Sequence, residues 1–101
     1  MTLQATLEFA PEKMAEVCRR FQVRELLVFG SATRGELRSD SDIDLLVEFE
    51  PDARVGFLRL AEAAEAFEEV LGRPVDLVPK DGLKPLLRSH VLGEARLLYA
   101  A

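Results

Sequence analysis

Residues 26–49 read LLVFGSATRGELRSDSDIDLLVEF, two apolar runs joined by a polar connection. The first run stops at Gly30, and the second is entered through Asp42 and Asp44. Side chains alternate between the two faces of a strand, so Asp42 and Asp44 share one face while Ile43 points to the other. Two adjacent carboxylates repel each other unless a cation lies between them, and hard oxygen ligands of this kind suit Mg²⁺. The second run therefore predicts a strand that carries a divalent-metal site.

The pair Gly30-Ser31 predicts a phosphate-binding turn. A glycine directly after a strand permits a tight turn and a close approach of the backbone. If residues 32–34 are helical, free backbone N–H groups and the Ser31 hydroxyl face an incoming anion. A phosphate cradle beside a metal site is the minimum apparatus for nucleotidyl transfer, where catalysis is mostly positioning and charge neutralisation. Each motif alone is commonplace, so the prediction depends on their occurring together.

Gly30-Ser31, ten residues and then Asp42-Ile43-Asp44 resembles the signature of the polymerase-β-like nucleotidyltransferase superfamily. The sequence from Phe29 to Phe49 is similar to the minimal nucleotidyltransferases, the MntA-type antitoxins that accompany HEPN-domain toxins. The resemblance implies an Mg²⁺-dependent enzyme that transfers AMP from ATP to a tyrosine hydroxyl of a HEPN-type toxin. It also implies a third acid on a later strand.

Asp76 is the candidate for that third acid. It lies within the apolar run 75–78, which is bounded by prolines and predicts a short strand. Its carboxylate joins those of Asp42 and Asp44 if this strand pairs beside theirs. An edge-strand aspartate that faces water is the alternative explanation from the residues alone. The resemblance implies that Asp42, Asp44 and Asp76 are the catalytic and metal-binding residues.

By the same resemblance, Gly30, Ser31 and Arg34 bind the nucleotide phosphates. Arg34 follows the cradle by one helical turn, where a cation can be directed at the phosphates. An ion pair between Arg34 and either Glu36 or Asp40 is the alternative explanation.

The rest of the sequence predicts the fold. Helical spacing of apolar residues favours helices over 11–21, 56–71 and 83–91, and apolar runs favour strands over 23–29, 42–49 and 75–78. Residues 95–99 fit either a strand or a helix end. This order predicts an α/β (α+β) fold with a small mixed β-sheet and helices packed on one face, forming one nucleotidyltransferase-like domain over residues 1–101. Cys18 lies on the apolar stripe of the first helix and is predicted to be a core residue.

The composition is that of an acidic globular chain. Thirteen basic and eighteen acidic residues give a net charge of −5, which argues against broad binding of nucleic acid. The single cysteine excludes an internal disulfide, and no signal peptide or apolar stretch of membrane-spanning length is present. We therefore expect a cytoplasmic protein with no membrane partner.

Other functions remain open at this point. A non-catalytic nucleotide-binding or scaffold subunit would neutralise a partner through protein contacts alone. Nucleotidylation of RNA or of a small molecule is disfavoured by the acidic balance and by the small size. Twenty-five residues follow Asp76, which leaves little chain to cover the base. We expect weak nucleotide affinity unless a partner or a second subunit, in a hetero- or homo-oligomer, completes the pocket.

Overall fold

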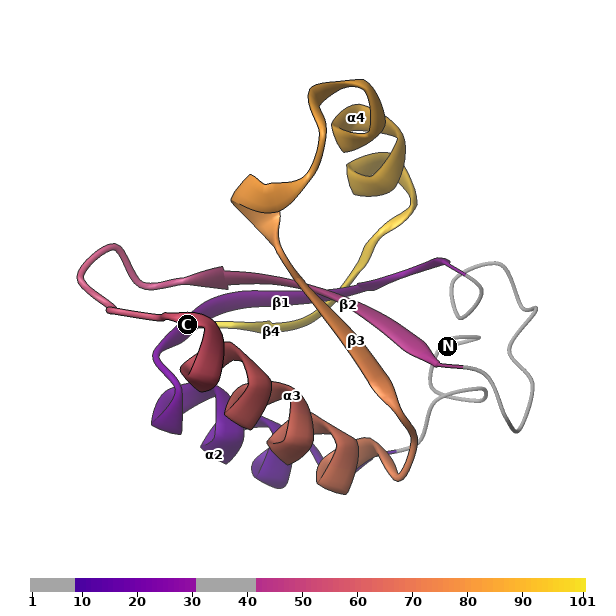
Figure 1. The fold of residues 1–101 in the computed structure, drawn as a ribbon. Coiled ribbons are helices and arrows are strands. Elements are labelled where there is room, and N and C mark those ends of the chain that lie inside the picture. The colour runs from indigo at the N-terminus through magenta and orange to yellow at the C-terminus, as the bar shows by residue number, and fades with distance from the viewer. Residues whose placement is uncertain (1–8, 31–41) are drawn as a thin grey trace.

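The computed structural model describes residues 9–30 and 42–101. In this part of the chain, helices and strands follow one another in the order shown in Figure 1: α2 (Pro11–Arg20), β1 (Val23–Phe29), β2 (Ile43–Phe49), α3 (Phe57–Leu71), β3 (Val75–Pro79), the 3₁₀ helix η2 (Lys80–Gly82), α4 (Pro85–Glu94) and β4 (Arg96–Ala100). The predicted short helix after Gly30 and the first eight residues lie outside the described residues.

The four strands form one mixed sheet in the order β3-β2-β1-β4. Strand β1 is antiparallel to both β2 and β4, whereas β2 and β3 are parallel. A parallel pair needs a long crossover, and α3 supplies it between β2 and β3. The mixed sheet is therefore confirmed, and residues 95–99, which the sequence left undecided, fall mostly within a strand.

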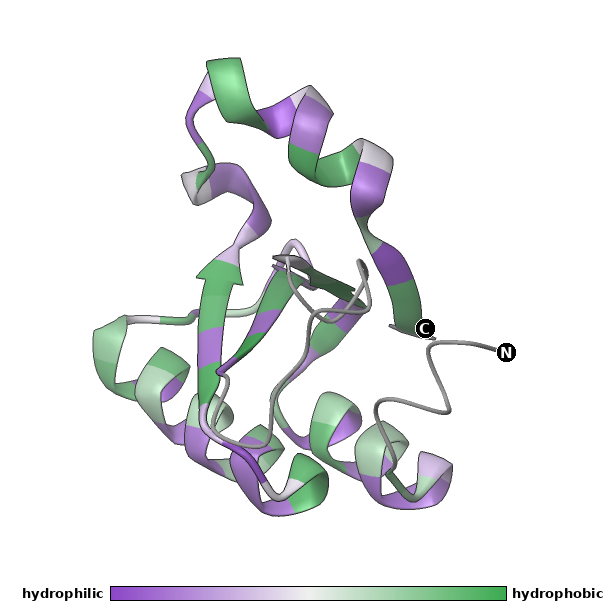
Figure 2. Ribbon diagram, turned by 90° about the vertical axis from the view of Figure 1, so that its right-hand side faces the viewer, coloured by the Kyte–Doolittle hydropathy of each residue, from purple (hydrophilic) through white to green (hydrophobic). Residues whose placement is uncertain are grey.

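Helices α2 and α3 cover one face of this sheet (Figures 1 and 2). Between these helices and the sheet lies the hydrophobic core, which includes Met14, Leu26, Ile43, Leu45 and Phe67, each no more than 1% exposed. The alternation of strand side chains sends the intervening residues of β1 and β2 to the opposite face. Helix packing on one face is thus confirmed for α2 and α3.

Helix α4 does not belong to that layer. Both ribbon views place it on the other side of the sheet from α2 and α3 (Figures 1 and 2). None of its residues is buried, and Leu86 is 94% exposed. The apolar residues of α4 predicted a helix correctly, but they do not contribute to the core.

Two helix ends show why the elements stop where they do. Pro11 occupies the first turn of α2, where its missing N–H costs no hydrogen bond. Helix α3 ends at Gly72, whose φ of 68° is left-handed and whose N–H donates to the Glu68 carbonyl at 2.7 Å. The predicted glycine stop is confirmed.

Cys18 is fully buried in α2, as predicted. Burial raises the pKa of its thiol to about 12, against a smaller opposing effect of the Arg19 charge. The thiolate is the reactive form of cysteine, so this side chain acts as a small apolar core residue.

Candidate active site

The parallel pairing of β2 and β3 brings two acids side by side. Asp44 and Asp76 are partners in the register of the two strands. Directly paired residues of neighbouring strands project from the same face of a sheet. That face is the one turned away from α2 and α3, because the flanking Ile43 and Leu45 are fully buried in the core. Asp76 lies on an edge strand and is exposed, as the alternative explanation expected, but its carboxylate also shares a face with that of Asp44.

Asp42 directly precedes β2, two residues before Asp44. If the extended backbone continues, its carboxylate falls on the same face. Asp42 and Asp76 are exposed and Asp44 is half-buried. The three acids therefore occupy the starts of β2 and β3 at one end of the sheet, where solvent has access.

Gly30 lies against the carboxylate of Asp44. It follows the last residue of β1, and that residue, Phe29, pairs with Asp44. Gly30 has a φ of 75°, and a Cβ built on it would stand 3.2 Å from the Asp44 Cγ and closer still to one carboxylate oxygen. Only glycine adopts this conformation readily and leaves room for the carboxylate. The predicted turn and the predicted acid strand thus meet.

Ser31 and Arg34, the other predicted phosphate ligands, lie outside the described residues. Their assignment to the nucleotide phosphates stays a prediction.

The carboxylates at the starts of β2 and β3 are the type of ligand that Mg²⁺ prefers. Carboxylate oxygens are hard ligands, and Mg²⁺ is commonly held by one or two carboxylates together with substrate phosphates and water. Within residues 9–30 and 42–101, no three His, Cys, Asp or Glu side chains are arranged to hold a metal ion by themselves. The in-register pair therefore fits a metal whose remaining ligands come from a bound nucleotide.

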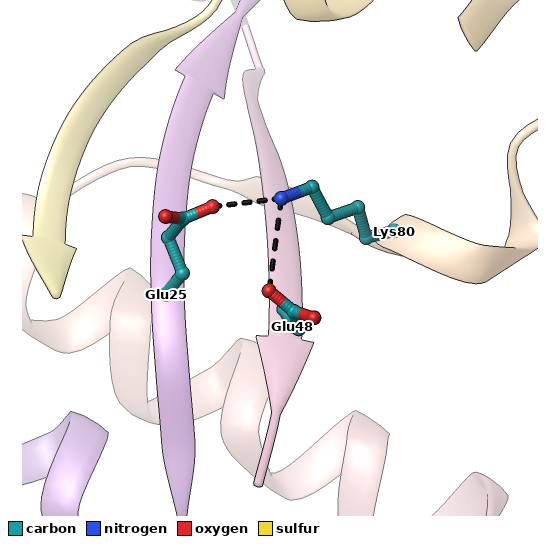
Figure 3. Close-up of polar contacts among 3 residues, drawn as sticks. All are labelled: Glu25, Glu48 and Lys80. Carbon is teal, nitrogen blue, oxygen red and sulfur yellow. Dashed lines mark hydrogen bonds and ion pairs between the residues drawn. The ribbon is translucent and has the colours of Figure 1, made fainter. Parts of the chain in front are cut away.

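A second charged cluster occupies the face of the sheet that carries Asp44. The sequence pattern did not predict it. Lys80 Nζ lies 2.8 Å from Glu25 of β1 and 3.6 Å from Glu48 of β2 (Figure 3). Glu25 and Glu48 pair directly across the antiparallel strands, so Lys80 neutralises two like charges. The hydrogen bond with Glu25, reinforced by both carboxylate charges, raises the pKa of Lys80 above its ordinary value of 10.5 despite the opposing effect of desolvation.

Strand periodicity could have placed one member of this cluster. Glu48 follows Asp44 by four residues within β2, whereas Lys80 lies just beyond the end of β3, in η2. Four residues of strand span about 13 Å and return to the same face. The open face therefore carries acids at the strand starts and, about 13 Å further along β2, Glu48 with its ion pair to Lys80.

A hollow in the described part of the chain lies away from the acids. It has a cavity volume of about 720 Å³ at the far end of β2, and its walls include Phe49, Phe57, Leu60, Lys80 and Arg88. Three cationic and three anionic side chains line it, so it has no net preference for a charged ligand. We do not assign the chemistry to it.

Comparison with known proteins decides the family. A family model described as "Nucleotidyltransferase domain" matches residues 12–98. The protein adenylyltransferase MntA of Thermococcus cleftensis is 42% identical over 94 residues, which cover 93% of each chain. This chain belongs to the MntA-type nucleotidyltransferases.

Two solved structures share the fold of this MntA-type chain. A toxin-antitoxin crystal structure with AMP-PNP has a TM-score of 0.72 at 22% identity, over 90% of this chain and 73% of the other. The Shewanella oneidensis MNT antitoxin, in complex with a tri-AMPylated HEPN toxin, has a TM-score of 0.64 at 20% identity, over 90% and 70% of the respective chains. The nucleotidyltransferase fold predicted for the sequence is confirmed.

Among the described residues, no helix is both long and apolar enough to cross a membrane.

Proposed function

We propose that this MntA-type chain transfers AMP from ATP to a hydroxyl group of a HEPN-type toxin, with Mg²⁺ as cofactor, and so acts as the antitoxin of the pair. The observation that carries the proposal is the meeting of Asp44, Asp76 and Gly30 at one end of the sheet. The names of the relatives support the acceptor: the similar T. cleftensis protein is a protein adenylyltransferase, and the S. oneidensis antitoxin is bound to an AMPylated HEPN toxin.

The reaction is an in-line displacement at the α-phosphorus of ATP. The acceptor oxygen forms a bond to phosphorus as the bond to pyrophosphate breaks. Asp76 accepts the proton of the attacking hydroxyl. If Asp76 instead held a second metal ion, the proton would pass to solvent. Asp42 and Asp44 are the metal ligands in this scheme, and bound Mg²⁺ would neutralise charge on the triphosphate.

The turn after β1 holds the rest of the triphosphate in this proposal. The backbone of Gly30 and the hydroxyl of Ser31 bind the β- and γ-phosphates, and Arg34 assists with its charge. The left-handed φ of Gly30 and its contact with the Asp44 carboxylate support this assignment, because they place the start of the turn beside a carboxylate that would hold the metal.

The test is transfer of labelled AMP to the partner toxin in the presence of Mg²⁺. We expect Asp44→Asn to lower the transfer rate by about a hundredfold or more, since the substitution removes the charge of a metal ligand with little change in shape. Asp52→Asn is the matched control, because Asp52 is an exposed acid in the turn after β2. Binding of the toxin by the wild type without transfer of label would overturn the proposal in favour of a non-catalytic scaffold.

A further inference from the structure

The peptide group between Pro74 and Val75, which leads into β3, is held on both sides by hydrogen bonds. The Ile43 N–H donates to the Pro74 carbonyl at 2.8 Å, which ties the start of β2 to the residue before β3. The Val75 N–H, on the first residue of β3, donates to the Glu68 side chain at 3.0 Å. Asp76 is the next residue. Its backbone position is therefore fixed by β2 on one side and by Glu68 of α3 on the other.

Glu68 makes two separate contacts with this segment. Its backbone carbonyl accepts the N–H of Gly72 at 2.7 Å and so ends α3. Its side-chain oxygen then accepts the N–H of Val75, seven residues along the chain. One residue thus holds both ends of the turn between α3 and β3. The other acids of α3, Glu62, Glu65 and Glu69, are exposed, whereas Glu68 is half-buried.

A backbone N–H at the edge of a sheet has no strand partner on its outer side. Because β3 is an edge strand, the Glu68 carboxylate supplies an acceptor that the sheet does not. A charged acceptor makes a stronger hydrogen bond than a neutral one. The contact restrains the first residue of β3, and through it the side chain that faces Asp44.

We propose that Glu68 is a positioning residue that sets Asp76 opposite Asp44 by holding the Val75 N–H. The proposal rests on the proposed function for its effect on catalysis. The Glu68 carboxylate has no direct role in the reaction. It holds the backbone N–H of Val75, the residue before Asp76. Active-site groups must be held closely, since a displacement of 1 Å can lower a rate by about a hundredfold.

The first experiment compares variants in the transfer of labelled AMP to the partner toxin. Glu68→Gln keeps an oxygen acceptor at the same reach, and we expect a kcat within about twofold of the wild type. Glu68→Asp keeps the charge but is one methylene too short, and Glu68→Ala removes the acceptor. For both we expect a fall in kcat of about tenfold, with the KM for ATP changed by less than about twofold.

Glu69→Ala is the matched control, since it removes a neighbouring exposed glutamate from the same helix and should leave kcat unchanged. Equal activity of Glu68→Gln and Glu68→Asp, or of Glu68→Ala and Glu69→Ala, would overturn the proposal. If Glu68→Ala does not fold, the comparison of the Gln and Asp variants still decides.

The second experiment needs no transfer activity. Hydrogen exchange of the Val75 amide, followed by NMR, should be slowed at least tenfold in the wild type and in Glu68→Gln, and should lose that protection in Glu68→Asp. Titration with Mg²⁺ alone should shift the Asp76 amide signal in the first two proteins more than in the third. A rapidly exchanging Val75 amide in the wild type would refute the contact. If the wild-type protein transfers no label but its Val75 amide is protected from hydrogen exchange, the proposed function is refuted and the positioning role stands.

Discussion

At the scale of single residues, the site depends on a glycine whose conformation and surroundings both exclude a side chain. Gly30 and Gly72 have nearly the same left-handed φ, 75° and 68°. They differ in what a Cβ would meet: the Asp44 carboxylate at Gly30, and nothing within 4 Å at Gly72. Substituting each of these two glycines therefore separates the effect of backbone strain from the effect of steric conflict within one protein.

We predict that Gly30→Ala and Gly72→Ala both lose stability, Gly30→Ala at least as much as Gly72→Ala, and that the two variants differ in activity. Alanine in a left-handed conformation costs about 1 kcal/mol, which should appear in both free energies of unfolding measured in urea. Gly30→Ala should also displace the Asp44 carboxylate and lower AMP transfer at least tenfold. Gly72→Ala should keep its transfer rate. Equal transfer by the two variants would show that the contact between Gly30 and Asp44 does not matter for the chemistry.

At the scale of elements, Lys80 joins the end of β3 to two other strands. Its ion pairs with Glu25 and Glu48 cross the open face of the sheet (Figure 3). The Lys80 side chain is 22% exposed and that of Glu48 is 41% exposed, so solvent screens part of the attraction. The cluster should therefore contribute modestly to stability, and in a pH-dependent way.

We predict that Lys80→Met lowers the free energy of unfolding by about 1 kcal/mol at neutral pH, because Glu25 and Glu48 are left opposite each other. The folded-state pKa of Lys80 lies above its ordinary value of 10.5. The stabilisation is therefore complete below pH 10.5 and is lost as pH rises through the higher folded-state pKa. Urea unfolding of wild type and variant between neutral pH and pH above 10.5 should show the two curves converging.

Lys84→Met is the control for this comparison, since Lys84 is an exposed lysine four residues further along. A difference between wild type and Lys80→Met that persists unchanged at high pH would contradict an ion-pair origin.

The sequence predicted the helices and strands more completely than it predicted which of them lie side by side. Strand β1 spans Val23–Phe29, as expected from its apolar run, and α3 ends at Gly72. The neighbourhood of Asp44 and Asp76 could not be derived from periodicity, because alternation fixes the face of each residue but not which strands pair. The same limit hid Lys80, whose partners lie on two other strands. Leu86 shows the converse, an apolar residue that the fold leaves exposed.

At the scale of the whole molecule, the acids lie at an open end of the sheet. Asp42 and Asp76 are exposed, and the hollow lined by Phe49, Phe57 and Lys80 is at the far end of β2. A nucleotide held at the acids by its phosphates would therefore gain little enclosure from residues 9–30 and 42–101, whereas small-molecule sites usually bury most of their ligand.

We predict that the isolated chain binds ATP with Mg²⁺ weakly and that the partner toxin increases the affinity at least tenfold, about 1.4 kcal/mol in binding free energy. Calorimetric titration with ATP and Mg²⁺, with and without the toxin, measures both values. Asp44→Asn, titrated in the same way, controls for binding elsewhere. Tight binding by the chain alone would contradict this expectation.

The parallel pairing of β2 and β3 also has a kinetic consequence. Asp44 and Asp76 are separated by the whole of α3, so they come together only after the crossover helix has docked. Contacts between distant parts of a chain form slowly because they close large loops. During synthesis, β1 and β2 can form a hairpin long before β3 leaves the ribosome. A nascent chain therefore carries Asp42 and Asp44 early but gains the third acid, Asp76, only when its edge strand is added.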